Sequence, residues 1–110
     1  MALGLSPWAL LAIAIALEVA GTLILKLSDG FAKVHWGVLA IALYSVCLWV
    51  LSSVLKSIPV GVAYAIWAGV GIVAIAAIGF LAFGERLGLS QIVYMILVVV
   101  GAAGLQMTTK

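Results

Sequence analysis

Four long apolar runs, separated by short polar links, account for almost the whole chain. They cover residues 7–25, 36–55, 60–83 and 89–107. A helix needs about 20 mostly apolar residues to cross a bilayer, and each run reaches roughly that length. We therefore predict an all-α membrane protein, with residues 1–110 forming a single domain of four transmembrane helices joined by short loops.

The composition excludes several other classes of protein. Of the 110 residues, 68% are hydrophobic and 7% are charged, whereas a soluble domain carries about 25% charged residues. A net charge of +2 offers no basic patch for nucleic acid. One cysteine (Cys47) and one histidine (His35) leave no disulfide and no metal cluster, and the only aspartate, Asp29, lies in a link. We expect no cofactor, no metal and no enzymatic activity.

The first run is expected to stay in the mature protein, because a signal peptide begins with basic residues and the first one here is Lys26. The loop charges are nearly balanced across the membrane. With both termini on one side, Lys56 and Lys110 lie there, and Lys26, Lys33 and Arg86 lie opposite. Such a small bias is either chance in a short tally or a sign that the protein inserts in both orientations.

Glu18 is the one charged residue inside an apolar run. On a helix it lies roughly 16 Å from Pro7, near the middle of a bilayer core about 30 Å thick. A charge there is costly, so an intramembrane carboxylate is by default a functional site. Its structural alternative is a hydrogen bond that specifies helix packing. Four helices enclose little space, so we expect an oligomer, most simply a dimer, with Glu18 facing a shared interior.

The neighbours of Glu18 on its helix face are mostly small, which leaves room for a guest molecule or for a closely packed helix. These neighbours are Leu11, Ala14, Ile15, Gly21 and Thr22. We predict that four of them line a substrate pocket, namely Leu11, Ala14, Gly21 and Thr22. A carboxylate that takes up and releases a proton in such a setting can exchange that proton for an organic cation.

Two aromatic residues of the third run, Tyr64 and Trp67, are three residues apart and share a helix face. Trp67 lies deeper than the interfacial belt where tryptophan is usual. A phenol and an indole near a carboxylate can bind a hydrophobic cation through cation–π contacts. Ordinary packing is the alternative, and both interpretations apply to Tyr44 in the second run.

Glycines of the third and fourth runs suggest bending and close contact. Gly69 and Gly71 permit a hinge, although small residues at four-residue spacing (Gly61, Ala65, Gly69) also suit tight packing. The fourth run has no ionisable residue apart from the weakly acidic Tyr94, and its Gly101 and Gly104 favour a role in dimer assembly.

These residues carry a resemblance to the small multidrug resistance family of bacterial transporters. The matching stretches are LEVAGTLILKLSDGF (17–31), IPVGVAYAIWAGVGIV (58–73) and FGERLGL (83–89). The resemblance implies an antiparallel, dual-topology homodimer in the bacterial inner membrane, which exports organic cations in exchange for protons.

The resemblance also assigns roles to individual residues. Glu18 would bind protons and substrate in competition, and Tyr44, Tyr64 and Trp67 would line the pocket. Gly69 and Gly71 match the bend of the family's third helix, and Gly101 matches a glycine of its dimer contact. Tyr94 departs from the family, whose members often have a second glycine there.

Within that family the residues around Glu18 favour one substrate class. Guanidinium exporters typically have EVxWA after the glutamate and a glycine three residues before it, whereas this chain has EVAGT and Ile15. It is thus similar to exporters of quaternary ammonium and polyaromatic cations. The alternatives are a guanidinium exporter, a proton-binding rotor subunit and a purely structural membrane protein.

Overall fold

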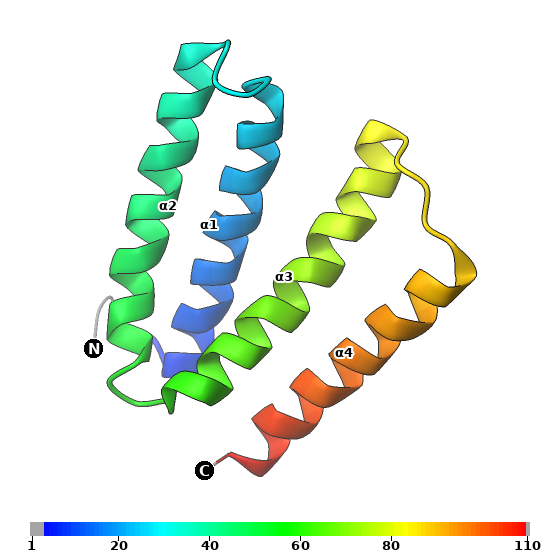
Figure 1. The fold of residues 1–110 in the computed structure, drawn as a ribbon. Coiled ribbons are helices and arrows are strands. Elements are labelled where there is room, and N and C mark those ends of the chain that lie inside the picture. Colours follow the sequence, from blue (N-terminus) through cyan, green and yellow to red (C-terminus); the bar gives the residue numbers. More distant parts are fainter. Residues whose placement is uncertain (1–3, 110) are drawn as a thin grey trace. The chain divides into compact units, whose positions relative to one another are not determined.

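The computed structural model describes residues 4–109, which form four helices (Figure 1). They are α1 (Pro7–Leu27), α2 (Val34–Val54), α3 (Val60–Phe83) and α4 (Leu89–Thr108). Each is long and apolar enough to cross a membrane. The observed bounds lie within two residues of the predicted runs. The prediction of an all-α membrane protein with four transmembrane helices is confirmed.

The N-terminus of α1 is fixed by its own sequence. The Ser6 side chain caps the helix by accepting a hydrogen bond from the Ala9 amide at 3.2 Å. Pro7 follows at the first helical position, where its missing N–H costs nothing. The helix then continues two residues beyond the apolar run, through Lys26 to Leu27, because a lysine at a helix end can extend its amine towards water.

A tight loop turns the chain from α1 into α2. Three successive residues, Asp29, Gly30 and Phe31, adopt positive φ angles of 52°, 65° and 68°. The fully buried Ser28 donates to the Leu25 carbonyl at 2.6 Å and accepts from the Phe31 amide at 3.2 Å. The Phe31 ring lies directly against Gly37, where any Cβ would collide with it. The predicted turn is therefore held by a buried hydroxyl and by a ring on a glycine.

The helices pair as two hairpins. α1 packs along α2 in a compact unit that ends at Pro59, and α3 packs along α4 in a second unit that begins at Val60. Figure 1 shows α1 and α2 running antiparallel beside each other in the first unit. The buried residues of α2 recur at three- and four-residue intervals, as expected for one helix face against a partner. These residues are Gly37, Ala40, Cys47, Val50, Leu51 and Val54.

A glycine of the second hairpin packs closely against the neighbouring helix. A Cβ on Gly69 of α3 would lie 3.0 Å from Val98 Cγ1 and 3.4 Å from the Ala102 Cβ of α4. Towards the linking loop, the two helices leave an apolar groove of about 270 Å³. Its lining residues are Val73, Ala77, Ile92, Met95, Ile96, Val99 and Val100.

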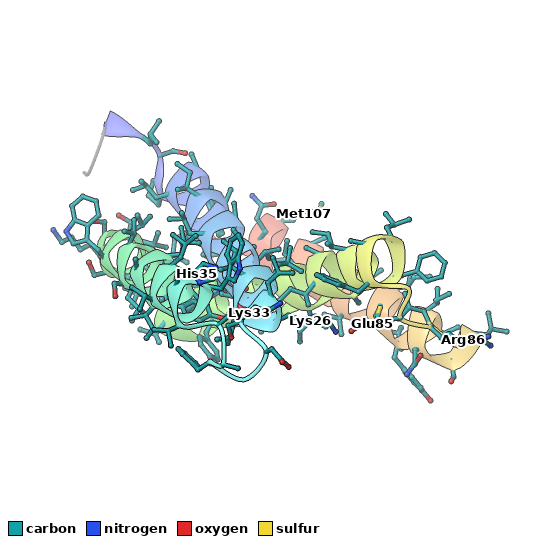
Figure 2. All side chains as sticks on the ribbon, turned by 90° about the horizontal axis from the view of Figure 1, so that it is seen from above. Lys26, Lys33, His35, Glu85, Arg86 and Met107 are labelled. Atoms are coloured by element: carbon teal, nitrogen blue, oxygen red, sulfur yellow. The ribbon has the colours of Figure 1, made fainter. Side chains whose placement is uncertain are left out.

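Charged side chains gather at the ends of the hairpins. Figure 2 shows them at the α1–α2 loop and at the α3–α4 loop. The labelled residues there are Lys26, Lys33 and His35 in the first hairpin and Glu85 and Arg86 in the second. Glu18 is the exception, because it belongs to the middle of α1.

Candidate functional site

Glu18 lies halfway along α1 and is half-buried. Its Oε1 accepts a hydrogen bond from the Thr22 hydroxyl at 3.3 Å. Residues four apart are neighbours on a helix surface, so this contact follows from the local sequence. The partner is a neutral hydroxyl, which orients the carboxylate without neutralising its charge.

The Thr22 hydroxyl also reaches the second helix. Its Oγ1 lies 2.6 Å from the hydroxyl oxygen of Tyr44 on α2. Glu18, Thr22 and Tyr44 therefore form a continuous hydrogen-bonded chain, which we call the Glu18 chain. Two of its members come from α1 and one from α2, so the packing of the two helices completes it.

Gly21 allows Tyr44 to come this close. A Cβ on Gly21 would lie 3.1 Å from Tyr44 Cε1, 3.2 Å from Tyr44 Cδ1 and 3.5 Å from Leu43 Cβ. The space that the glycine leaves beside Glu18 is thus filled by the tyrosine ring. The sequence left two possibilities for the space beside Gly21, a guest molecule or a closely packed helix. In this protein a closely packed helix, α2, occupies it.

Leu11 is buried two turns before Glu18, and Ala14 is buried one turn before it. Their exposed fractions are 2% and 0%. The Ala14 carbonyl accepts a hydrogen bond from the Cys47 thiol of α2 at 3.1 Å. Ala14 and Gly21 therefore contact α2 on either side of the level of Glu18. A role for Leu11 and Ala14 as walls of a substrate pocket stays a prediction.

Tyr64 and Trp67 pair on α3 as their spacing predicts. Their ring centroids are 5.6 Å apart and the ring planes make an angle of 85°, an edge-to-face arrangement. Such a pair contributes about 0.5–1.5 kcal/mol beyond its buried area. Tyr64 is 64% exposed, so its ring is open to a ligand, a lipid or another chain.

The candidate residues thus fall into two groups, one in each hairpin. The Glu18 chain, with Gly21, belongs to α1 and α2, and the aromatic pair belongs to α3. Within residues 4–109, no three histidine, cysteine, aspartate or glutamate side chains come together as a metal site.

The glycines of α3 and α4 differ in their surroundings. Gly69 and Gly71 are buried and α3 is helical through both, with Gly69 closely packed on α4. The packing interpretation therefore applies to Gly69, and a hinge stays a prediction. Gly101 and Gly104 are exposed, with no other atoms within 4 Å of the position a Cβ would take. Tyr94 is exposed as well.

Sequence reasoning missed the contribution of Cys47. It considered this residue only as a lone cysteine, whereas the structure places its thiol in the contact between α1 and α2. The signal was available, because Cys47 follows Tyr44 by three residues and so shares its helix face.

The chain is similar to known proteins over most of its length. Residues 6–98 match the family model described as Small Multidrug Resistance protein. The chain is 46% identical to the quaternary ammonium compound-resistance protein QacE of Escherichia coli, over 94% of each chain. It is 42% identical to the multidrug transporter EmrE of Escherichia coli K12, over 88% of each. It is also 43% identical to the spermidine export protein MdtI of Salmonella arizonae, over 83% of this chain and 84% of that one.

Proposed function

Because the chain belongs to the small multidrug resistance family, as a multi-pass protein of the bacterial inner membrane, we propose that it is a proton-coupled antiporter of hydrophobic organic cations. Glu18 binds a proton and a cation in alternation. Proton binding releases the cation on one side of the membrane, and the cation displaces the proton on the other.

The observation that carries this proposal is the position of the Glu18 carboxylate and its hydrogen-bond partner. It lies in the middle of a membrane-spanning helix, and its hydrogen-bond partner is the neutral Thr22 hydroxyl. Lys26, the basic residue nearest to it along the chain, lies eight residues away, or about 12 Å along the helix. An ionised carboxylate at this depth is costly, so a mobile proton or cation is the means of neutralising it.

The aromatic residues support a hydrophobic, aromatic or quaternary ammonium cation as substrate. Tyr64 and Trp67 offer ring faces of the kind that binds such cations, and the hydroxyl of Tyr44 is linked to Glu18 through Thr22. The printed names of QacE and EmrE, for quaternary ammonium resistance and multidrug transport, favour the same class.

An antiparallel homodimer completes the proposal. Loop charges are nearly balanced, so both orientations of the chain can insert. The exposed Gly101 and Gly104 of α4 allow a second copy to approach closely. In a dimer, each copy contributes one Glu18 to a shared interior, where protons and the cation compete for the two carboxylates. Gly69 and Gly71 serve as the bend of α3 when the site changes sides.

The test is proton-driven uptake of tetraphenylphosphonium into vesicles that contain the purified protein under an imposed pH gradient. Glu18→Gln keeps the side-chain volume and removes the charge, so we expect coupled uptake to be abolished while folding and dimerisation persist. Glu85→Gln, in the α3–α4 loop, is the matched control and should retain uptake. Proton-driven uptake by Glu18→Gln would overturn the mechanism.

A second candidate substrate is a flexible polyamine such as spermidine, favoured by the similarity to MdtI. Spermidine carries primary and secondary ammonium groups, which hydrogen-bond to a carboxylate, so its transport would depend more on Glu18 than on Trp67. A panel of tetraphenylphosphonium, ethidium, spermidine and guanidinium distinguishes the classes. Uptake of spermidine or guanidinium without that of aromatic cations would assign the protein to the alternative class.

A further inference from the structure

The Thr22 hydroxyl touches two groups that have been given separate roles. It donates to Glu18 Oε1 at 3.3 Å and lies 2.6 Å from the Tyr44 hydroxyl oxygen. The position of Thr22 on the same helix face as Glu18 predicts that it lines a substrate pocket. Its contacts here are with the protein, which points to a different role.

A hydroxyl group has only one proton to donate, and this determines which group donates and which accepts along the Glu18 chain. Thr22 carries one hydroxyl proton, and donating it to Glu18 leaves Oγ1 as an acceptor. Tyr44 must then donate to Thr22, so both donors point towards the ionised carboxylate. When Glu18 takes up a proton, its carboxyl group becomes a donor and the chain can run the other way. The Tyr44 hydroxyl then becomes the acceptor of the Thr22 proton.

The surroundings hold the three groups in this register. Thr22 is one turn after Glu18 on the same helix face, and Tyr44 is brought in by the glycine at position 21. On the facing helix α2, the Cys47 thiol is a further titratable group near Glu18. That thiol donates to the Ala14 carbonyl and not to Glu18.

We propose that Thr22 is a positioning residue that makes Glu18 and Tyr44 one hydrogen-bonded unit, so that the two α1–α2 hydroxyls set the pH at which cation and proton exchange on Glu18. This inference rests on the proposed function. It assigns Thr22 an action through Glu18 instead of a contact with the cation. Hydrogen bonds to an ionised group favour the ionised form, so the intact unit favours cation binding at lower pH.

The experiment is tetraphenylphosphonium binding to the purified protein over a range of pH. Thr22→Val keeps the shape and removes the hydroxyl, and we expect the pH of half-maximal binding to rise by about 0.5 unit, equivalent to threefold weaker competition with protons. Thr22→Ser keeps the hydroxyl and should restore the wild-type midpoint. Ser45→Ala is the matched control, because the Ser45 hydroxyl donates to the Ile41 carbonyl on an exposed part of α2.

Tyr44→Phe provides the second, independent measurement, since it keeps the ring on Gly21 and removes the phenol oxygen. We expect a smaller rise of the midpoint, and we expect Thr22→Val combined with Tyr44→Phe to match Thr22→Val alone, because Tyr44 acts through Thr22. An unchanged midpoint in both single variants, or shifts that simply add, would overturn the inference. A wild-type protein whose binding does not depend on pH would instead overturn the proposed function.

Discussion

In the first hairpin, α1 and α2 are joined by two hydrogen bonds, one between the Thr22 and Tyr44 side chains and one from the Cys47 thiol to the Ala14 carbonyl. In the second hairpin, Gly69 of α3 packs against Val98 and Ala102 of α4. In the apolar stretch of α1, 33% of the residues are buried, whereas in that of α4 only 6% are buried. The polar contacts orient the carboxylate in the first hairpin. In the second hairpin, α4 is left open to a partner chain or to lipid.

The difference matters because hydrogen bonds and apolar contacts differ in how far one helix can shift against another. Hydrogen bonds in the membrane fix one register between two helices, since a shifted helix would leave polar groups unpaired. Apolar contacts between helices allow small displacements at little cost. Under the proposed function, the first hairpin would hold the binding geometry and the second would move or assemble.

The largest expected effect comes from replacing Gly21 of the first hairpin with a larger residue. Gly21→Val would press on the Tyr44 ring, which a Cβ already approaches to 3.1 Å. Overpacking of this kind costs about 1–3 kcal/mol, and it displaces the Tyr44 hydroxyl from Thr22. We expect tetraphenylphosphonium binding to weaken by more than about 30-fold.

Gly61→Val is the control for this substitution, because no other atoms lie within 4 Å of a Cβ at Gly61 of α3. It should bind as the wild type does. Equal losses in both variants would show that the two hairpins do not differ in the way described.

The next effect concerns the aromatic pair of α3. Trp67→Ala removes one ring of the edge-to-face pair, and a cation–π contact away from water contributes about 2 kcal/mol. We expect aromatic-cation binding to weaken about 10- to 30-fold, with little change in proton binding, measured by isothermal titration of each ligand. Trp49→Ala, on an exposed part of α2, is the control. A matching loss of proton binding would contradict a role limited to the cation.

A smaller effect is expected on assembly through α4. Replacing Gly101 and Gly104 with isoleucine would put side chains where nothing now lies within 4 Å of a Cβ. If a second copy packs there, the dimer should weaken by about 1 kcal/mol, or fivefold. Energy transfer between labelled chains in vesicles measures it. An unchanged dimer would mean that these glycines face lipid.

The smallest effect is expected at Cys47. Cys47→Ala removes the thiol that donates to the Ala14 carbonyl, a contact expected to contribute less than about 1 kcal/mol. Denaturant titration in detergent should show a correspondingly small loss of stability, with cation binding retained. Cys47→Ser keeps a donor and should be closer to the wild type. A loss of binding in Cys47→Ala would place Cys47 in the site itself.

Several features of the fold were predictable because they depend on residues close together in the chain. Apolar runs of about 20 residues become spanning helices irrespective of their neighbours. The contact of Thr22 with Glu18 and the pairing of Tyr64 with Trp67 follow from the periodicity of a helix. The helix ends were less predictable, because charged residues such as Lys26 can continue a helix into the interface.

The contacts between helices could not be predicted, because they depend on the register in which two helices pack. Sequence alone identified Glu18 as the group to be neutralised and Gly21 as a source of free volume beside it. Only the tertiary structure decided that Tyr44 occupies that volume and that Cys47 donates to Ala14. The physical reason is that a helix face is set by local spacing, whereas the residue opposite it is set by packing over the full length of both helices.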